Sequence, residues 1–127
     1  MKSPSLLILV VEDDQLIKEM IQVALSEGGF DSEVVGSGEE AVALLQDQEY
    51  RALLTDINLQ GELSGWDVAK RAREFRPDIP VVYMTGAAAD QWPSHGVPGS
   101  ILLQKPFAPA QVVTAIAQLL NQTPPAA

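Results

Sequence analysis

Short apolar segments alternate along this chain with segments in which apolar residues recur every three or four positions. The segment 6–11 (LLILVV) is apolar throughout, which is typical of a strand covered on both faces. Further apolar runs predict strands at 32–35, 51–55, 81–84 and 100–104. Helical spacing predicts helices over 15–27, after Ser37, over 66–75 and over 109–120. This alternation predicts an α/β fold, a doubly wound five-stranded parallel sheet with helices on both faces.

The ends of the first two helices carry recognisable signals. Asp14 directly precedes the first helical stripe and is expected to cap it, and Gly28-Gly29 is expected to end it. Ser37 and Glu40 match a capping box, in which the two side chains satisfy free amide groups at a helix start.

Residues 86–99 should hold a fourth helix, but they are rich in Gly and Pro. A regular helix cannot run through Pro93, Gly96 and Pro98, because proline lacks the amide proton and glycine disfavours the helix. We expect a short or irregular fourth helix, with at most one or two turns near 87–91.

Polar residues stand at the carboxyl ends of four predicted strands, where doubly wound sheets bind their ligands. Residues 12–14 (EDD) follow the first strand, Asp56 the third, Thr85 the fourth and Lys105 the fifth. Packed carboxylates repel one another, and a hard divalent cation relieves that conflict. Oxygen ligands without histidine or cysteine favour Mg²⁺. The carboxylates, the ammonium and the hydroxyl together fit a phosphoryl group carried on a carboxylate.

Composition excludes several other functions. The 127 residues, enough for one domain, include 17 acidic and 8 basic side chains, a formal net charge of -9. That balance argues against nucleic acid and against an anionic membrane surface. The basic residues of 70–76 are interpreted as a solvated helix face.

With no cysteine and one histidine, disulfides, thiolate zinc sites and multi-histidine metal sites are excluded. No apolar run is long enough for a signal peptide or a membrane span, so we expect a cytoplasmic protein.

Four motifs in order along the chain resemble the receiver domains of two-component response regulators: VVEDD at 10–14, LLTDINL at 53–59, MTG at 84–86 and KPF at 105–107. The resemblance covers about residues 6–120, and the MTG form is similar to stand-alone receivers and to those attached to kinases. It implies a flavodoxin-like receiver fold with strand order 2-1-3-4-5 and a cis Lys105-Pro106 bond. We expect a receiver domain over 1–122, a frayed Pro-rich tail at 123–127 and no output domain.

The resemblance also implies a Mg²⁺ site. Asp13 would bind the ion directly and Glu12 would act through water. Asp56 would be the second carboxylate ligand, and the backbone carbonyl of Asn58 would be the third protein ligand.

The same resemblance implies that Asp56 accepts a phosphoryl group from a histidine kinase or a histidine phosphotransfer protein. Thr85 would reorient to bind a phosphoryl oxygen, and Lys105 would pair with it. The domain would catalyse only its own phosphorylation and dephosphorylation, and would signal by protein–protein interaction or by passing the phosphoryl group on in a phosphorelay. The sequence does not identify the downstream protein.

Three positions depart from the family pattern. Leu102 stands where an aromatic switch residue is usual, so this chain lacks the ring whose flip the family couples to the hydroxyl at position 85. The proline that commonly follows the phosphorylated loop is replaced within 60–64 (QGELS), and the fourth helix is weakened. We therefore expect signalling through a rearranged segment 86–99.

Three other functions share parts of this pattern. An aspartate-based phosphatase also uses Asp, Thr, Lys and Mg²⁺, but it needs a nucleophile and a second Asp two positions later, a spacing that residues 12–16 lack. A flavin carrier of the same topology holds its phosphate in a hydroxyl-rich loop after the first strand, where three acids would repel it. A degenerate receiver, used only for interaction, would not need all five key positions.

Overall fold

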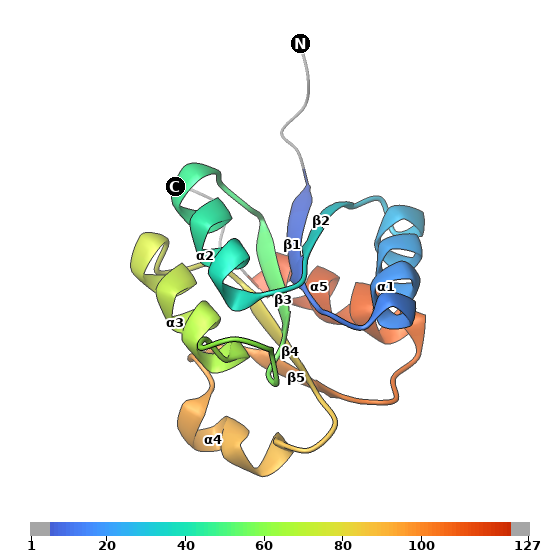
Figure 1. The fold of residues 1–127 in the computed structure, drawn as a ribbon. Helices are drawn as coiled ribbons and strands as arrows, with labels where there is room; N and C mark the ends of the chain where they lie inside the picture. The colour runs from blue at the N-terminus through green and yellow to red at the C-terminus, as the bar shows by residue number, and fades with distance from the viewer. Residues whose placement is uncertain (1–5, 123–127) are drawn as a thin grey trace.

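The computed structural model describes residues 6–122 and consists of one parallel sheet between two layers of helices (Figure 1). The strands are β1 (Leu7–Val11), β2 (Asp31–Val35), β3 (Ala52–Asp56), β4 (Val81–Thr85) and β5 (Ile101–Gln104). Their order is β2-β1-β3-β4-β5, and every neighbouring pair is parallel. The predicted fold class and strand order are therefore confirmed. The tail predicted at 123–127 lies outside the described residues.

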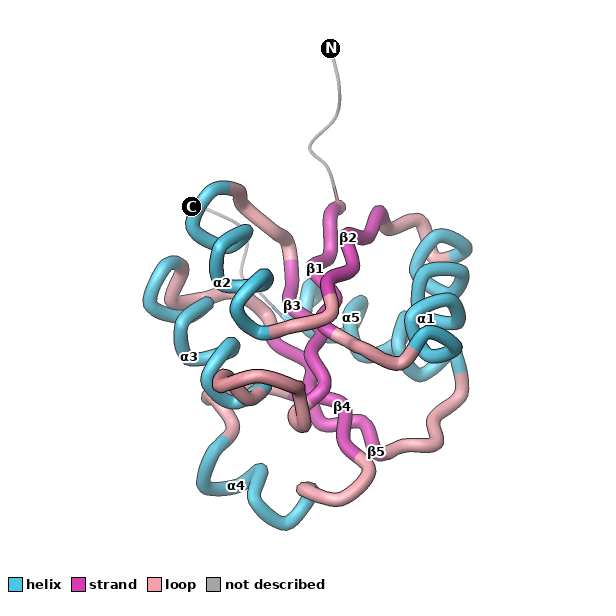
Figure 2. Tube along the Cα trace, in the orientation of Figure 1, coloured by secondary structure: helices cyan, strands magenta, loops and turns pink. Residues whose placement is uncertain are grey.

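Helices cover both faces of the sheet (Figure 2). They are α1 (Gln15–Glu27), α2 (Gly38–Asp47), α3 (Gly65–Phe75), α4 (Trp92–His95) and α5 (Pro109–Gln122), with a 3₁₀ turn η1 at Ala89–Gln91 before α4. Alternate residues of β1 face opposite layers: Leu9 and Val11 pack with α2 and α3, whereas Ile8 and Val10 pack with α1 and α5. This two-sided burial explains why β1, β3 and β4 are apolar at nearly every position, whereas the edge strand β2 (DSEVV) is less buried and partly polar. Within 6–122, no helix is both long and apolar enough to cross a membrane.

The fourth helix is short, as expected, but its position differs from the prediction. Helical turns cover η1 and α4, residues 89–95, instead of 87–91. Pro93 lies in the first turn of α4, where the missing amide proton has no intrahelical partner to lose. The helix ends at Gly96, whose amide donates to the Trp92 carbonyl. Pro93 is therefore compatible with a helix that begins at Trp92.

Helix starts are set by side-chain caps. Asp14 Oδ1 accepts from the Ile17 amide at 3.1 Å, which confirms the predicted cap of α1. Ser37 Oγ accepts from the Glu40 amide at 3.2 Å, but the Glu40 carboxylate accepts from the Ser37 hydroxyl and so completes only half of the predicted capping box. A complete capping box, which was not predicted, instead joins Ser64 and Asp67 at the start of α3.

The interpretation of the basic residues of α3 as a solvated face is wrong for two of them. Arg73 Nε donates to the Ile79 carbonyl at 2.8 Å, and Arg76 Nη1 donates to the Tyr50 carbonyl. These two side chains are partly buried and tie the end of α3 to the neighbouring loops. Lys70 and Arg71 remain exposed.

Candidate functional site

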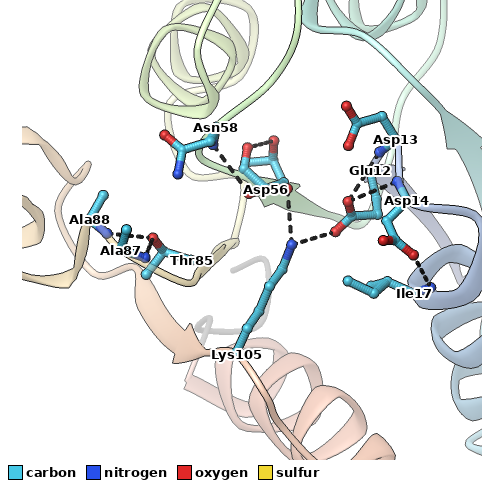
Figure 3. A network of polar contacts seen from close by, with 11 residues as sticks. Glu12, Asp13, Asp14, Ile17, Asp56, Asn58, Thr85, Ala87, Ala88 and Lys105 are labelled. Atoms are coloured by element: carbon cyan, nitrogen blue, oxygen red, sulfur yellow. Dashed lines mark hydrogen bonds and ion pairs between the residues drawn. The ribbon is translucent and has the colours of Figure 1, made fainter.

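Strand register brings the predicted site residues together at the carboxyl edge of the sheet (Figure 3). Val11 of β1 pairs with Thr55 of β3, so the residues that follow them, Glu12 and Asp56, lie beside one another. Thr85 of β4 pairs with Gln104 of β5, and Lys105 comes next along the chain. We call Glu12, Asp13, Asp56 and Lys105 the acidic site.

Glu12 is fully buried, and each of its carboxylate oxygens has a hydrogen-bond partner. Oε2 accepts from the amides of Asp13 and Asp14 at 3.1 and 3.2 Å, and Oε1 accepts from Lys105 Nζ at 3.1 Å. Burial raises the pKa of Glu12 above its usual value, although the amide and ammonium donors oppose the shift. A second cation at this site would favour the ionised carboxylate.

Lys105 links two carboxylates with its single ammonium group. Nζ donates to Asp56 Oδ2 at 3.0 Å as well as to Glu12, and the Lys105-Pro106 bond is cis, as predicted. Burial alone would lower the pKa of Lys105, but its hydrogen bonds to Asp56 and Glu12 outweigh that effect and raise it. Lys105 therefore stays protonated and supplies one positive charge to the site.

Asp56 ends β3 and is 6% exposed. Oδ1 accepts from the Asn58 amide at 3.1 Å, and Oδ2 accepts from Lys105. One oxygen is thus held by the backbone of the following loop and the other by a cation. This places a carboxylate, held in one orientation, where the strand meets the β3–α3 loop, residues 57–64.

Three carboxylates of the acidic site lie close enough to share one ion. Glu12, Asp13 and Asp56 each offer an oxygen, and these oxygens lie within 4.8 Å of one another. Glu12 and Asp56 are buried, whereas Asp13 is exposed and leaves the site open to solvent on its side. The donors are all oxygen, and one ammonium does not balance three acids. A hard cation such as Mg²⁺ therefore fits both the ligand set and the charge.

Thr85 is buried beside the site but makes no hydrogen bond with its carboxylates or its lysine. Its Oγ1 accepts from the amides of Ala87 and Ala88 at 3.1 and 2.8 Å, and Figure 3 shows the hydroxyl on the side of these residues. Thr85 thus shapes the start of the β4–α4 segment. The structure joins Lys105 to Glu12 and Asp56 by hydrogen bonds and places the Asp13 carboxylate near them, whereas Thr85 bonds to other residues. Asn58 contacts the site through its backbone amide, while its side chain is exposed.

Two contacts around the site were not predicted. Gly65, the first residue of α3, packs directly on the backbone of Asp56 and Ile57, and its amide donates to the Ile57 carbonyl at 2.8 Å. Glu39 of α2 contacts the β3–α3 loop. The spacing Ser64-x-x-Asp67 before an apolar stripe would have indicated where α3 begins. No local signal indicates the contact of Glu39, because it depends on how α2 lies beside the loop.

Lys105→Met tests how the ammonium stabilises the buried acids. We expect the free energy of unfolding, measured by urea denaturation without added metal, to fall by about 1–3 kcal/mol, because two carboxylates lose their cation. Breaking a buried pair costs about 3–5 kcal/mol, and the partial exposure of Lys105 reduces that figure. Lys70→Met, at an exposed position, is the control and should change stability by less than about 0.5 kcal/mol. Equal stability of the two variants would contradict this role.

Comparison with known proteins agrees with this arrangement. The model of the response regulator receiver domain family matches residues 8–117. A response regulator receiver protein from Sinorhizobium medicae WSM419 has a TM-score of 0.90 at 39% identity, over 93% of this chain and 96% of that one. The response regulator receiver protein CpdR from Brucella abortus is 33% identical over 115 residues, 89% of this chain and 95% of CpdR.

A more distant solved structure has the same fold, and a further sequence relative is longer than this chain. The receiver domain of the sensor histidine kinase PA1611 from Pseudomonas aeruginosa PAO1, crystallised with a magnesium ion in its active site cleft, has a TM-score of 0.82 at 23% identity, over 94% of this chain and 100% of that one. The phosphate regulon transcriptional regulatory protein PhoB from Pseudomonas aeruginosa is 31% identical over 93% of this chain. The chain spans about half of the length of PhoB, 53%.

Proposed function

The chain belongs to the response regulator receiver family of two-component systems, and on that premise we propose that Asp56 is its phosphoacceptor. The observation that carries the proposal is the environment of the Asp56 carboxylate. It is buried at a strand end, one oxygen bonds to Lys105 and the other to the Asn58 amide, and two further acids lie beside it. A nucleophile held in one orientation next to a fixed cation suits phosphoryl transfer, which depends on positioning and charge.

The donor in this proposal is the phosphohistidine of a histidine kinase or of a histidine phosphotransfer protein. An Asp56 oxygen attacks the phosphorus, the new O–P bond forms, and the P–N bond breaks with its electron pair returning to the histidine ring. The Lys105 ammonium lies 3.0 Å from Asp56 Oδ2 and balances negative charge as the group arrives. Hydrolysis of the acyl phosphate by water then returns Asp56 to a carboxylate and releases inorganic phosphate. The domain thus turns over its own aspartylphosphate and no separate substrate.

Mg²⁺ is the ion that we propose for the acidic site. Asp13 and Asp56 would bind it directly, Glu12 through water, and the Asn58 backbone carbonyl would complete the protein ligands. The bound ion would supply positive charge to the phosphoryl oxygens. The clustered carboxylate oxygens of this chain support the proposal, and the magnesium ion in the PA1611 receiver is a parallel in the same fold.

Thr85 is the residue that we propose to respond to the phosphoryl group. Its Oγ1 is held by the Ala87 and Ala88 amides. Turning toward the phosphoryl group would give up these two hydrogen bonds and release the start of residues 86–99. This supports our expectation that phosphorylation is signalled by a change in residues 86–99. Such a change does not require an aromatic residue at position 102.

We propose a protein, and not nucleic acid, as the downstream partner. After Asp90, Lys105 is the one Asp, Glu, Lys or Arg in the sequence, and it points into the acidic site. The surface formed by α4, β5 and α5 therefore has no cation to bind phosphates, but it suits contact with a neutral protein surface.

Asp13→Ala tests the metal ligands. We expect Mg²⁺ affinity, measured by isothermal titration calorimetry, to fall by roughly tenfold or more, because the site loses the carboxylate that is most accessible to the ion. Asp47→Ala removes an equally exposed acid at the end of α2 and should leave the affinity within about twofold of the wild type, since screening weakens distant charges. An Asp13→Ala titration that overlays the wild-type titration would rule out this ligand.

The proposed function is tested by intact-mass spectrometry after incubation with acetyl phosphate. We expect the wild-type chain to gain one phosphoryl group in Mg²⁺ and essentially none after chelation with EDTA. An unmodified chain in Mg²⁺ would contradict the proposal, and so would equal labelling in EDTA. Phosphotransfer from a purified histidine phosphotransfer protein would then test the donor class.

A further inference from the structure

A carboxylate of α2 accepts hydrogen bonds from the backbone of the β3–α3 loop. Glu39 Oε2 accepts from the amides of Glu62 and Leu63 at 3.0 and 3.3 Å, across 23 and 24 residues of sequence. These hydrogen bonds involve a charged acceptor and are stronger than bonds between neutral groups. A hydrogen bond from its own backbone amide, followed by those from Glu62 and Leu63, lowers the pKa of Glu39, which remains ionised at neutral pH.

Two glycines allow α2 and the loop to approach closely enough for this contact. Gly61 has φ +101°, and a Cβ there would lie 2.9 Å from Glu39 Oε1. A Cβ at Gly38 would lie 2.8 Å from the Cβ of Leu63. Side chains at either glycine would push the loop away from α2. The backbone is therefore shaped to receive the Glu39 carboxylate.

The loop that Glu39 holds also supplies the backbone contacts of Asp56. The Asn58 amide donates to Asp56 Oδ1, and the Ile57 carbonyl accepts from Gly65. The first part of the loop is thus anchored at the acidic site. Its later part is held by the hydrogen bonds to Glu39, by the cap at Ser64 and by packing of Leu63 against the core. A change at residues 62 and 63 would be transmitted along this short segment to residue 58.

We propose that Glu39 is a positioning residue for phosphorylation, holding the β3–α3 loop so that the Asn58 backbone keeps the Asp56 carboxylate oriented. This inference rests on the proposed function of Asp56. Glu39 itself touches neither Asp56 nor Lys105. Glu39 acts on the orientation of Asp56 through the loop. In this proposal an acid of α2, away from the strand ends, also influences the rate of phosphorylation.

A simpler role for Glu39 would be to stabilise α2, because a negative charge near the start of a helix interacts favourably with the helix dipole. Glu40 separates the two roles, because it lies in the same first turn, is equally exposed and carries the same charge. Its carboxylate accepts only from the Ser37 hydroxyl, at 3.1 Å, and does not reach the loop. Glu40→Ala is therefore the matched control for Glu39→Ala.

The experiment compares wild type, Glu39→Ala, Glu39→Gln and Glu40→Ala by their initial rates of phosphorylation with acetyl phosphate in saturating Mg²⁺. We expect Glu39→Ala to slow phosphorylation about threefold to tenfold, because small displacements of a reacting group are costly. Glu40→Ala should stay within about twofold of the wild type. Glu39→Gln keeps an oxygen that can accept both amides and should recover most of the rate. Amide hydrogen exchange of Asn58, read by NMR, should accelerate in Glu39→Ala alone.

The outcomes separate this inference from the proposed function. A labelled wild type with equal rates in Glu39→Ala and Glu40→Ala would overturn the role of Glu39 and leave Asp56 as acceptor. Slowing in Glu39→Ala without faster exchange at Asn58 would overturn transmission through the loop. A wild type that is not labelled would overturn the proposed function and the role of Glu39 in it.

Discussion

Asp56→Ala is expected to abolish covalent labelling by acetyl phosphate in the presence of Mg²⁺. The substitution removes the nucleophile. The two remaining acids of the site, Glu12 and Asp13, do not have the hydrogen bonds and exposure that Asp56 has. Glu12 is fully buried and its oxygens are occupied by two amides and by Lys105. Asp13 is exposed and lacks the ammonium contact. The measurement is intact mass over a time course on which the wild type is completely labelled.

Asp56→Asn is the matched variant for this experiment. The amide keeps an oxygen that can accept from Asn58 and has the same shape, but it cannot form a stable acyl phosphate. Loss of labelling in both variants, with circular dichroism spectra like that of the wild type, would assign the effect to the missing carboxylate. Persistent labelling of either variant at another residue would exclude Asp56 as the acceptor.

Gly65→Ala is expected to have the largest effect on stability, a loss of about 3 kcal/mol in the free energy of unfolding. A Cβ at this position would lie 2.2 Å from the Asp56 carbonyl oxygen and 2.7 Å from the Ile57 Cα. Both contacts are with backbone, which cannot move aside as a flexible side chain can. The start of α3 would have to shift away from the strand end, and phosphorylation should slow together with the loss of stability.

Gly36→Ala is the control for this substitution. The nearest atom to a Cβ there is Lys18 Nζ at 4.0 Å, and Gly36 does not have a positive φ. We expect Gly36→Ala to be neutral or slightly stabilising, since alanine restricts the unfolded chain. Urea denaturation of both variants gives the comparison. A Gly65→Ala protein as stable as Gly36→Ala would show that α3 does not pack on Asp56 as described.

Most of the fold and much of the site could be predicted because they depend on local pattern. Strands buried on both faces have continuous apolar sequences, and their carboxyl ends must share one edge of a parallel sheet. That rule alone brings Glu12, Asp56 and Lys105 together. Asp14 could be predicted as a cap because its position before a helical stripe is a local signal.

The parts that could not be predicted depend on tertiary contact. Arg73 and Arg76 look like surface charges in the sequence, but their partners are carbonyl groups that approach from other segments. Glu39 contacts a loop 23 residues away, and the two meet because α2 packs beside that loop, with Gly38 against Leu63. The position of α4 was misjudged because Pro93 was taken as a helix breaker, whereas it occupies the first turn, where proline is tolerated.

The central claim is that the acidic site forms an aspartylphosphate at Asp56. The most direct measurement is peptide mass spectrometry of the wild-type chain after incubation with acetyl phosphate and Mg²⁺, with fragmentation that localises the modification. We predict a single phosphoryl group on the peptide that contains Asp56. A phosphoryl group on a peptide without Asp56, or no modified peptide at full Mg²⁺ occupancy, would contradict the account.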